Sequence, residues 1–277
     1  MSIEVKWNSH LFPESEGVIV GCNQNQEWLL PWWWMHFRLY NNQPVTFINF
    51  GDMSNKALDW CKAHADVISL DVPNTFIALK EKVDPLTADK WQKMHSGIWT
   101  ARASWFLKPF VMLKSPYLRT VWMDLDCQIR GSIQPLFSKC LNEAGIAIAA
   151  ELPYFQLDSL KLGHLVPGEV MYNTGVLVFN RRSKIIEEWA RTTLDQNHLF
   201  YGDQHLLSRL LFLQKPQFTV LPYIYNWPIE MGFNQQAIII HWYARFRLKV
   251  IEQIQVLQKF FYINLSLDIL KENEKSN

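Results

Sequence analysis

The stretch "TVWMDLDCQI" at residues 120–129 joins a hydrophobic run to two aspartates, Asp124 and Asp126, with one apolar residue between them. The apolar run is typical of a buried β-strand, so the aspartates stand where that strand ends. Side chains alternate along an extended chain, and the two carboxylates are therefore expected on one side. They would repel each other unless a divalent cation lay between or beside them. The alternative is a pair of turn aspartates that cap the next segment.

Short β-branched runs alternate with longer mixed segments on both sides of this stretch. Such alternation predicts a parallel sheet covered by helices, in which ligands bind at the carboxyl edge of the strands. A break is expected at Lys108-Pro109, because proline cannot continue a helix from inside it. The expected strands are 17–23, 45–52, 65–71, 119–124, 145–152, 170–180 and 237–243. The expected helices are 26–42, 54–64, 86–114, 183–197, 203–212 and 248–262.

Composition limits the classes of partner. Of 277 residues, 49% are hydrophobic and 19% are charged, which suits a globular protein with a substantial core. The 27 basic and 26 acidic residues give a formal net charge of +1, and no block of lysine or arginine offers a track for a nucleic-acid backbone. We therefore expect no nucleic-acid partner. No linker interrupts the chain, so one domain is expected over 1–277.

The location of the protein is predicted from its cysteines and apolar runs. Four widely spaced cysteines without a CxxC pair are expected to be free thiols in a reducing compartment. No signal peptide is predicted, and no apolar run reaches the roughly 18 residues of a membrane span. The tryptophan-rich stretch 28–40 is expected to form a core helix or a peripheral contact with a membrane. A cytoplasmic protein is expected, with a secreted effector as the alternative.

Polar residues also stand at the ends of other predicted elements. They are Asn173 and Gly175 in "YNTGVLVFN", Asp203 and Gln204 in "YGDQHLL", and His241 in "IIIHWY". A neutral imidazole is a good ligand for Mn²⁺-like metals, so His241 is a candidate to complete the ligand set that the aspartate pair begins.

This ordered set of motifs resembles a known family. Asp-x-Asp, then Asn-Thr-Gly-Val-Leu-x-Phe-Asn, then Asp-Gln, then Ile-Ile-His-Trp is similar to the pattern of GT-A fold glycosyltransferases, and most similar to the glycogenin and galactosyltransferase-like group called family 8. The segments 105–129 and 221–228 fit the same pattern, and the resemblance covers roughly residues 17–245. It implies an α/β protein with a GT-A (Rossmann-like) fold, whose twisted, mainly parallel central sheet is flanked by helices.

The resemblance also implies an activity. Members transfer a hexose from a nucleotide diphosphate sugar to a carbohydrate or protein acceptor, with retention of configuration and with Mn²⁺ or Mg²⁺ bound. UDP-glucose or UDP-galactose is the expected donor. The implied division of the chain is a nucleotide-binding half at about 1–130, an acceptor and catalytic half at about 131–250, and a C-terminal helix at about 248–270.

Residue by residue, the resemblance implies three groups of site residues. The metal ligands are Asp124, Asp126 and His241. The residues that bind the donor diphosphate are Arg102, Lys108, Asp124, Arg247 and Lys249. The residues that contact the donor sugar or line its reacting face are Asn173, Asp203 and Gln204.

One motif departs from the family pattern. The family usually continues His-x-x-Gly-x-x-Lys-Pro-Trp, whereas this chain has Ala244 at the glycine and Arg247 at the lysine. Arginine can still bind a diphosphate, and with two parallel hydrogen bonds.

Two other functions fit the aspartate pair. A phosphatase of the haloacid-dehalogenase type uses Asp-x-Asp after a strand, but its motif normally stands near the N-terminus and continues to Thr or Val, whereas here Cys127 follows. A non-catalytic protein that binds a nucleotide sugar on the same fold is the other alternative, and the altered loop after His241 permits it.

Overall fold

The computed structural model describes residues 3, 5–8 and 16–261. Within them a central sheet of seven strands has the order β3-β2-β1-β4-β7-β6-β8, and a second sheet of three strands has the order β5-β10-β9. The strands of the central sheet are β1 (Glu16–Cys22), β2 (Val45–Asn49), β3 (Asp66–Ser69), β4 (Arg119–Met123), β6 (Ile146–Ala150), β7 (Tyr172–Asn180) and β8 (Thr219–Leu221). Those of the second sheet are β5 (Cys127–Ile129), β9 (Trp227–Pro228) and β10 (Ile239–His241).

The central sheet is mainly parallel. Strand β1 runs parallel to β2 and β4, β2 to β3, and β6 to β8. Only β7 is antiparallel to its neighbours, β4 and β6. Because β7 is reversed, its first residues lie beside the end of β4, where the two aspartates stand. The predicted α/β class with a mainly parallel GT-A sheet is confirmed.

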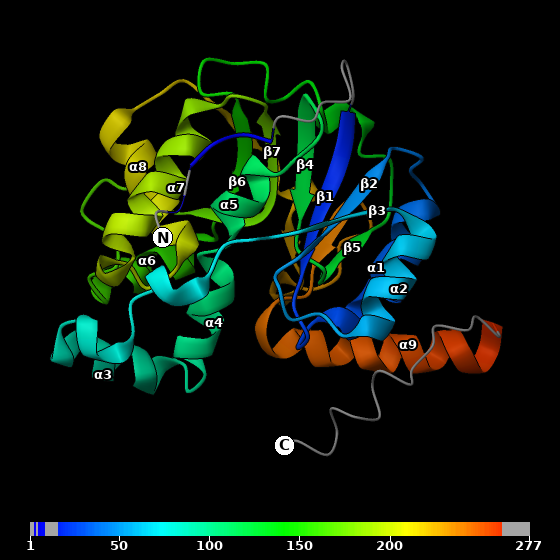
Figure 1. Cartoon of the computed structure of the whole chain (residues 1–277), viewed down its shortest axis with the longest axis horizontal. Helices are drawn as coiled ribbons and strands as arrows, with labels where there is room; N and C mark the ends of the chain where they lie inside the picture. Colours follow the sequence, from blue (N-terminus) through cyan, green and yellow to red (C-terminus); the bar gives the residue numbers. More distant parts are fainter. Residues whose placement is uncertain (1–2, 4, 9–15, 262–277) are drawn as a thin grey trace.

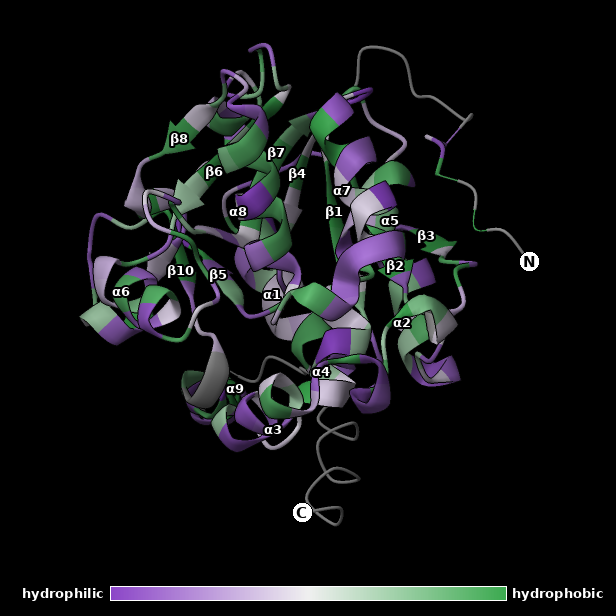
Figure 2. Ribbon diagram, turned by 90° about the vertical axis from the view of Figure 1, so that its left-hand side faces the viewer, coloured by the Kyte–Doolittle hydropathy of each residue, from purple (hydrophilic) through white to green (hydrophobic). Residues whose placement is uncertain are grey.

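Helices cover both faces of the central sheet (Figure 1). Side chains alternate along β1, so Val18 and Val20 pack with α1, α2 and α9, whereas Ile19 packs with α5, α7 and α8. In Figure 2 the strands are mostly hydrophobic, while the surrounding helices carry hydrophilic residues as well. The helices are α1 (Leu30–Arg38), α2 (Asn55–His64), α3 (Pro85–Met94), α4 (Ile98–Trp105), α5 (Lys108–Leu113), α6 (Pro153–Lys161), α7 (Lys184–Gln196), α8 (Asp203–Gln214) and α9 (Leu248–Phe261).

The tryptophan-rich stretch forms α1, which belongs to the core. Trp32 and Trp33 are fully buried and pack with the β-strand residues of the same face. Across the described ranges, no helix combines the length and the apolar character that crossing a bilayer requires. The four cysteines are free, as predicted, and all four are buried.

The structure refines several predicted elements. The expected helix 86–114 is three helices, and the predicted break at Lys108-Pro109 is confirmed, because α5 begins there with proline in its first turn. A further break follows α3, which ends at Met94. The predicted strand 237–243 is β10, which lies in the second sheet. Helix α9 matches the predicted C-terminal helix to residue 261, and residues 262–270 of that prediction lie outside the described residues.

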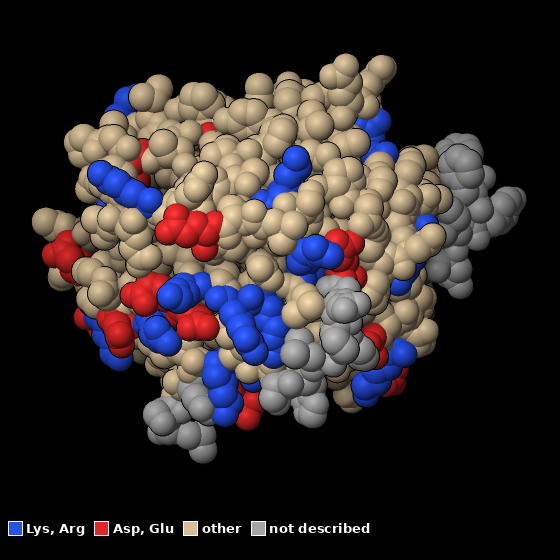
Figure 3. Space-filling view, turned by 90° about the horizontal axis from the view of Figure 1, so that it is seen from above, with Lys and Arg blue, Asp and Glu red and all other residues tan. Residues whose placement is uncertain are grey.

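The charges on one face of the molecule are mixed. In Figure 3, basic and acidic side chains lie interspersed on the lower half of the view, and most of the upper half is uncharged.

Candidate active site

The Asp-x-Asp motif forms the turn that carries the chain from the central sheet into the second sheet. Strand β4 ends at Met123 and β5 begins at Cys127. The backbone N–H of Asp124 donates to the carbonyl of Gly175 at 2.8 Å, and the N–H of Cys127 donates to the carbonyl of Asp124 at 3.0 Å. Leu125, between the two aspartates, is buried in the core. The turn is therefore fixed on both sides, with its carboxylates at the carboxyl edge of β4.

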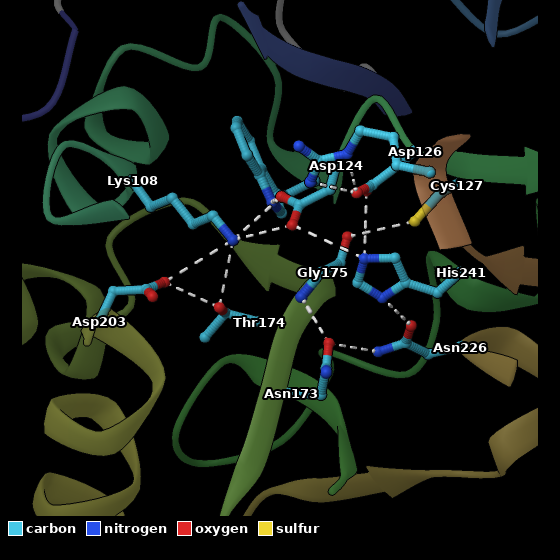
Figure 4. Close-up of polar contacts among 12 residues, drawn as sticks. Lys108, Asp124, Asp126, Cys127, Asn173, Thr174, Gly175, Asp203, Asn226 and His241 are labelled. Atoms are coloured by element: carbon cyan, nitrogen blue, oxygen red, sulfur yellow. Dashed lines mark hydrogen bonds and ion pairs between the residues drawn. The ribbon is translucent and has the colours of Figure 1, made fainter. Parts of the chain in front are cut away.

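Strand β10 brings His241 to this turn. It pairs antiparallel with β5, which sets His241 opposite Cys127. The imidazole Nε2 lies 3.2 Å from Asp126 Oδ1 and 3.9 Å from Asp124 Oδ2, as Figure 4 shows. Residues from two separate parts of the sequence thus converge on one point.

Glycine at position 175 makes room for the imidazole. A Cβ added at Gly175 would lie 2.1 Å from His241 Cε1 and 2.6 Å from its Nδ1. No side chain can be accommodated at such distances without moving the ring. The glycine of the Asn-Thr-Gly motif is therefore needed for close packing of β7 against His241.

Lys108 balances the charge of two carboxylates. Its Nζ lies 3.0 Å from Asp124 and 3.7 Å from Asp203, and it donates to Thr174 Oγ1 at 3.2 Å. Burial lowers the pKa of Lys108, but Asp124 and Asp203 outweigh burial and raise it to about 12. Burial raises the pKa of Asp203, and Lys108 opposes this effect. The lysine therefore stays charged at neutral pH and holds the start of α8 against the end of β4.

Arg247 binds the other aspartate. Its Nε and Nη2 donate to Asp126 Oδ2 at 3.0 and 2.6 Å. Burial raises the pKa of Asp126, but Arg247 and then His241 outweigh burial and hold that pKa well below its usual range. Only 3% of the Asp126 side chain is exposed, against 34% of Arg247, so the guanidinium links a buried carboxylate to the surface.

The ligand atoms fit a divalent cation. Oδ1 of Asp126 is buried and accepts no hydrogen bond, although Oδ2 of the same carboxylate accepts two. The unsatisfied oxygen faces His241 Nε2, and Asp124 Oδ2 lies on the same side. Oxygen and imidazole nitrogen are ligands that Mn²⁺ and Mg²⁺ accept. Among the described residues, the ligand atoms that lie within 4.8 Å of one another are those of Asp126, Cys127 and His241, and Asp124 is not part of this set. Burial raises the pKa of the Cys127 thiol, and the thiol donates to the Gly175 carbonyl.

Three other predicted residues lie around this centre. Asp203, the first residue of α8, accepts from Thr174 Oγ1 at 2.8 Å. Asn173 donates to Glu151 at 2.8 Å and accepts from Asn226 at 3.0 Å. Gln204 is half-buried beside Met171, with its Nε2 3.8 Å from Met171 Sδ.

Two predicted donor-binding residues are not brought into the cluster. Arg102 is fully buried and donates to the carbonyls of Phe200, Tyr201 and Asn197, where it fixes the segment that leads into α8. Lys249 is exposed on α9 and lines a cavity of about 460 Å³ together with His36, Gln128 and Trp242.

Sequence reasoning missed three residues that the structure adds to the centre. Trp122 Nε1 donates to Asp124 Oδ1 at 2.9 Å. Thr174 bridges Lys108 and Asp203. Asn226 Oδ1 lies 3.0 Å from His241 Nδ1. Trp122 and Thr174 stand next to residues or motifs that were predicted, and Asn226 lies in the segment 221–228 that fits the family pattern.

Comparison with solved structures identifies glycosyltransferases of the same fold. The galactosyltransferase LgtC, solved with donor and acceptor sugar analogues, is 13% identical over 87% of this chain and 94% of its own, with a TM-score of 0.55. Mouse xyloside xylosyltransferase 1 is 18% identical over 82% of this chain and 97% of its own, with a TM-score of 0.50. The glycosyltransferase GlyE of Streptococcus pneumoniae is 14% identical over 95% of this chain and 64% of its own, with a TM-score of 0.55.

Comparison of the sequence alone is negative. No protein-family model and no curated protein matches the chain. At identities this low, the structural likeness concerns the fold. The chain therefore has the fold of glycosyltransferases, with a charged and histidine-containing centre at the carboxyl edge of its central sheet.

Replacing Gly175 by alanine tests the packing of His241. The added Cβ must displace the ring or the strand, so we expect Gly175→Ala to lower the free energy of unfolding by about 1–3 kcal/mol. The matched control is Gly97→Ala, where the nearest atom to an added Cβ is 3.4 Å away. Its effect should stay within about 1 kcal/mol. Urea denaturation of both variants measures the difference, and equal losses would contradict the close contact.

Replacing Arg102 by methionine separates its predicted role in binding the donor from its observed role in fixing the segment that leads into α8. Three buried carbonyls lose their donor, so Arg102→Met should lower the free energy of unfolding by about 3 kcal/mol or more. The control Arg191→Met removes an arginine whose side chain is 55% exposed and should cost less than about 1 kcal/mol. A variant with unchanged stability but weakened nucleotide binding would instead support the predicted donor contact.

Proposed function

We propose that the protein is a metal-dependent glycosyltransferase that transfers a hexose from a UDP-sugar, UDP-glucose or UDP-galactose, to a carbohydrate or protein acceptor. The observation that carries this proposal is the convergence of Asp124, Asp126 and His241 at the carboxyl edge of a glycosyltransferase fold. The whole chain is proposed to act as one domain, with the donor nucleotide bound by its first half. Four free, buried cysteines are compatible with the proposed cytoplasmic location.

The reaction builds negative charge on the leaving diphosphate as the bond to the sugar breaks. A bound Mn²⁺ or Mg²⁺ would supply Lewis-acid stabilisation of that charge. Asp124, Asp126 and His241 would hold the ion. Arg247, already fixed beside Asp126, adds a guanidinium that is suited to a phosphate oxygen.

The remaining polar residues are assigned to the sugar. Asp203 is held by Lys108 and Thr174, so its carboxylate is positioned before the donor binds. We assign Asp203 and Asn173 to orienting the donor sugar, and Gln204 to its reacting face. The acceptor hydroxyl then attacks the anomeric carbon, with retention of configuration. Retention is tested by the anomeric coupling constant of the product in NMR, and an inverted product would refute it.

The fold favours this function over the phosphatase alternative. The similar solved structures that carry the comparison are glycosyltransferases.

Thermal stability with nucleotide sugars tests the donor site. A ligand that binds only the folded state, at 100 times its Kd, adds about 2.7 kcal/mol to the free energy of unfolding. We therefore expect Tm to rise by about 5 °C or more with one UDP-sugar in the presence of Mn²⁺, and to stay constant when EDTA is added.

Two aspartate variants provide the comparison. Asp124→Asn should abolish the rise in Tm, because a metal ligand loses its charge. Asp89→Asn removes an exposed carboxylate that pairs with Lys80, and it should keep the full rise. A rise that persists in EDTA, or in the Asp124→Asn protein, would contradict the metal-dependent donor site.

Arg247 variants test the departure from the family pattern. Loss of the guanidinium in Arg247→Met should lower kcat/KM for sugar transfer by about 100-fold. Arg247→Lys keeps the charge and should lose less. Release of UDP with the matched acceptor measures both variants, and a fully active Arg247→Met protein would remove this residue from the mechanism.

A further inference from the structure

Three buried residues and the half-buried Asn173 form a chain of hydrogen bonds that ends at His241. Asn173 Nδ2 donates to Glu151 Oε2 at 2.8 Å, and Asn226 Nδ2 donates to Asn173 Oδ1 at 3.0 Å. Asn226 Oδ1 lies 3.0 Å from His241 Nδ1. Figure 4 shows the part of this chain from Asn173 to the imidazole. Glu151, Asn226 and His241 are each at most 5% exposed, so water does not compete for these contacts.

One fixed donor, the Gly175 N–H, and one fixed acceptor, the Glu151 carboxylate, set the direction of this chain of hydrogen bonds. The backbone N–H of Gly175 donates to Asn173 at 2.9 Å, so the amide oxygen of Asn173 must face it. The Glu151 carboxylate also accepts from the N–H of Leu152 at 3.0 Å and offers its other oxygen to Asn173, so the amide nitrogen of Asn173 must face Glu151. Both constraints give the Asn173 side chain the same orientation.

The orientation of Asn173 determines that of Asn226. Because the Asn173 oxygen accepts, Asn226 must present its NH₂ group there and its oxygen to the imidazole. The amide oxygen of Asn226 can only accept a hydrogen bond, so Nδ1 of His241 must carry a proton and donate it to this oxygen. The proton of a neutral imidazole is then on Nδ1, and Nε2 keeps its lone pair.

The lone pair of Nε2 faces the two carboxylates. It lies 3.2 Å from the unsatisfied Asp126 Oδ1 and 3.9 Å from Asp124 Oδ2. If Nε2 carried the proton instead, the ring would donate to Asp126 and close the position between them. With the lone pair there, a cation bound between Nε2 and the carboxylate oxygens would offset the repulsion between these three atoms.

We propose that Asn226 is a positioning residue that keeps His241 in the tautomer required of a metal ligand, and that Asn173 and Glu151 hold Asn226 in the required orientation. This inference deepens the proposed function, because it rests on the metal site proposed there. Partners in this outer position are known to orient metal-bound histidines and to affect metal affinity about 10–100-fold.

The tautomer is measured without metal or activity. In protein labelled with ¹⁵N-histidine at pH 8, two-bond ¹H–¹⁵N correlation spectra distinguish a ring protonated on Nδ1 from one protonated on Nε2. The His241→Gln variant identifies the signal. We expect Nδ1 to carry the proton in the original protein. A proton on Nε2, or on both nitrogens, would overturn the proposal.

Two variants of Asn226 test its role as the acceptor: neither can donate to Asn173, and only Asn226→Asp can accept the proton of His241. Asn226→Leu removes the acceptor, so the proton should move to Nε2, and Mn²⁺ affinity measured by EPR of the free ion should fall by about 10–100-fold. Asn226→Asp keeps an acceptor and should retain both the proton on Nδ1 and an affinity within about 10-fold of the original. Thermal unfolding of the metal-free proteins shows whether each variant is folded.

The outcomes separate this proposal from the proposed function. An Asn226→Leu protein that is folded and keeps the Nδ1 proton or the original Mn²⁺ affinity overturns the role of Asn226 and leaves the metal site in place. Absence of Mn²⁺ binding in the original protein overturns both. Should Asn226→Leu not fold, Asn226→Ser, whose shorter side chain does not reach the ring, replaces it with the same expectation.

Discussion

The placement of two like-charged carboxylates within one turn, one of them buried and the other half-buried, is the constraint on which the rest of the site depends. Asp126 is almost completely buried, and a carboxylate there is tolerated only with positive charge and donors close by. Lys108 and Arg247 supply that charge from positions 16 residues before Asp124 and 121 residues after Asp126. The segment that precedes α9 must therefore return to the edge of the central sheet.

The architecture meets this constraint through its second sheet. Strand β5 leaves the aspartate turn directly, and β10 pairs with it, so His241 is delivered to the turn by backbone hydrogen bonds rather than by a loop. Reversal of β7 brings the Asn-Thr-Gly segment to the same place. Gly175 makes room for the imidazole, and Asn173 and Asn226 orient it. Lys108 binds Asp124 and Arg247 binds Asp126, and Asp126 Oδ1, which faces His241, is left without a hydrogen-bond donor.

Much of this could be predicted from the sequence. The β-branched runs predicted β1, β2, β3 and β4 within a few residues, because short apolar runs rich in such residues are typical of strands. The 3-residue strand β5 and the 2-residue strand β9 are too short to carry such a pattern. Helix α6, "PYFQLDSLK", has only one buried residue, so its amphipathic signal is weak.

The site residues were predictable only in part, because the sequence shows their types and order but not their contacts. Asp124, Asp126 and His241 were identified because ligand types in a known order are visible in the sequence. Arg102 has the residue type of a phosphate ligand, but its buried contacts with backbone carbonyls depend on how α4 packs against the 197–201 segment. Asn226 acts through a neighbour 53 residues earlier in the sequence, and only the three-dimensional structure brings these two side chains together.

The most direct test of the central claim is the position of the ion itself. Crystals grown with MnCl₂ and UDP, with data collected near the manganese absorption edge, would locate it by anomalous scattering. The account predicts one strong peak at about 2.0–2.3 Å from Asp126 Oδ1 and His241 Nε2, with Asp124 on the same side. A well-ordered UDP with no manganese between these residues would contradict it.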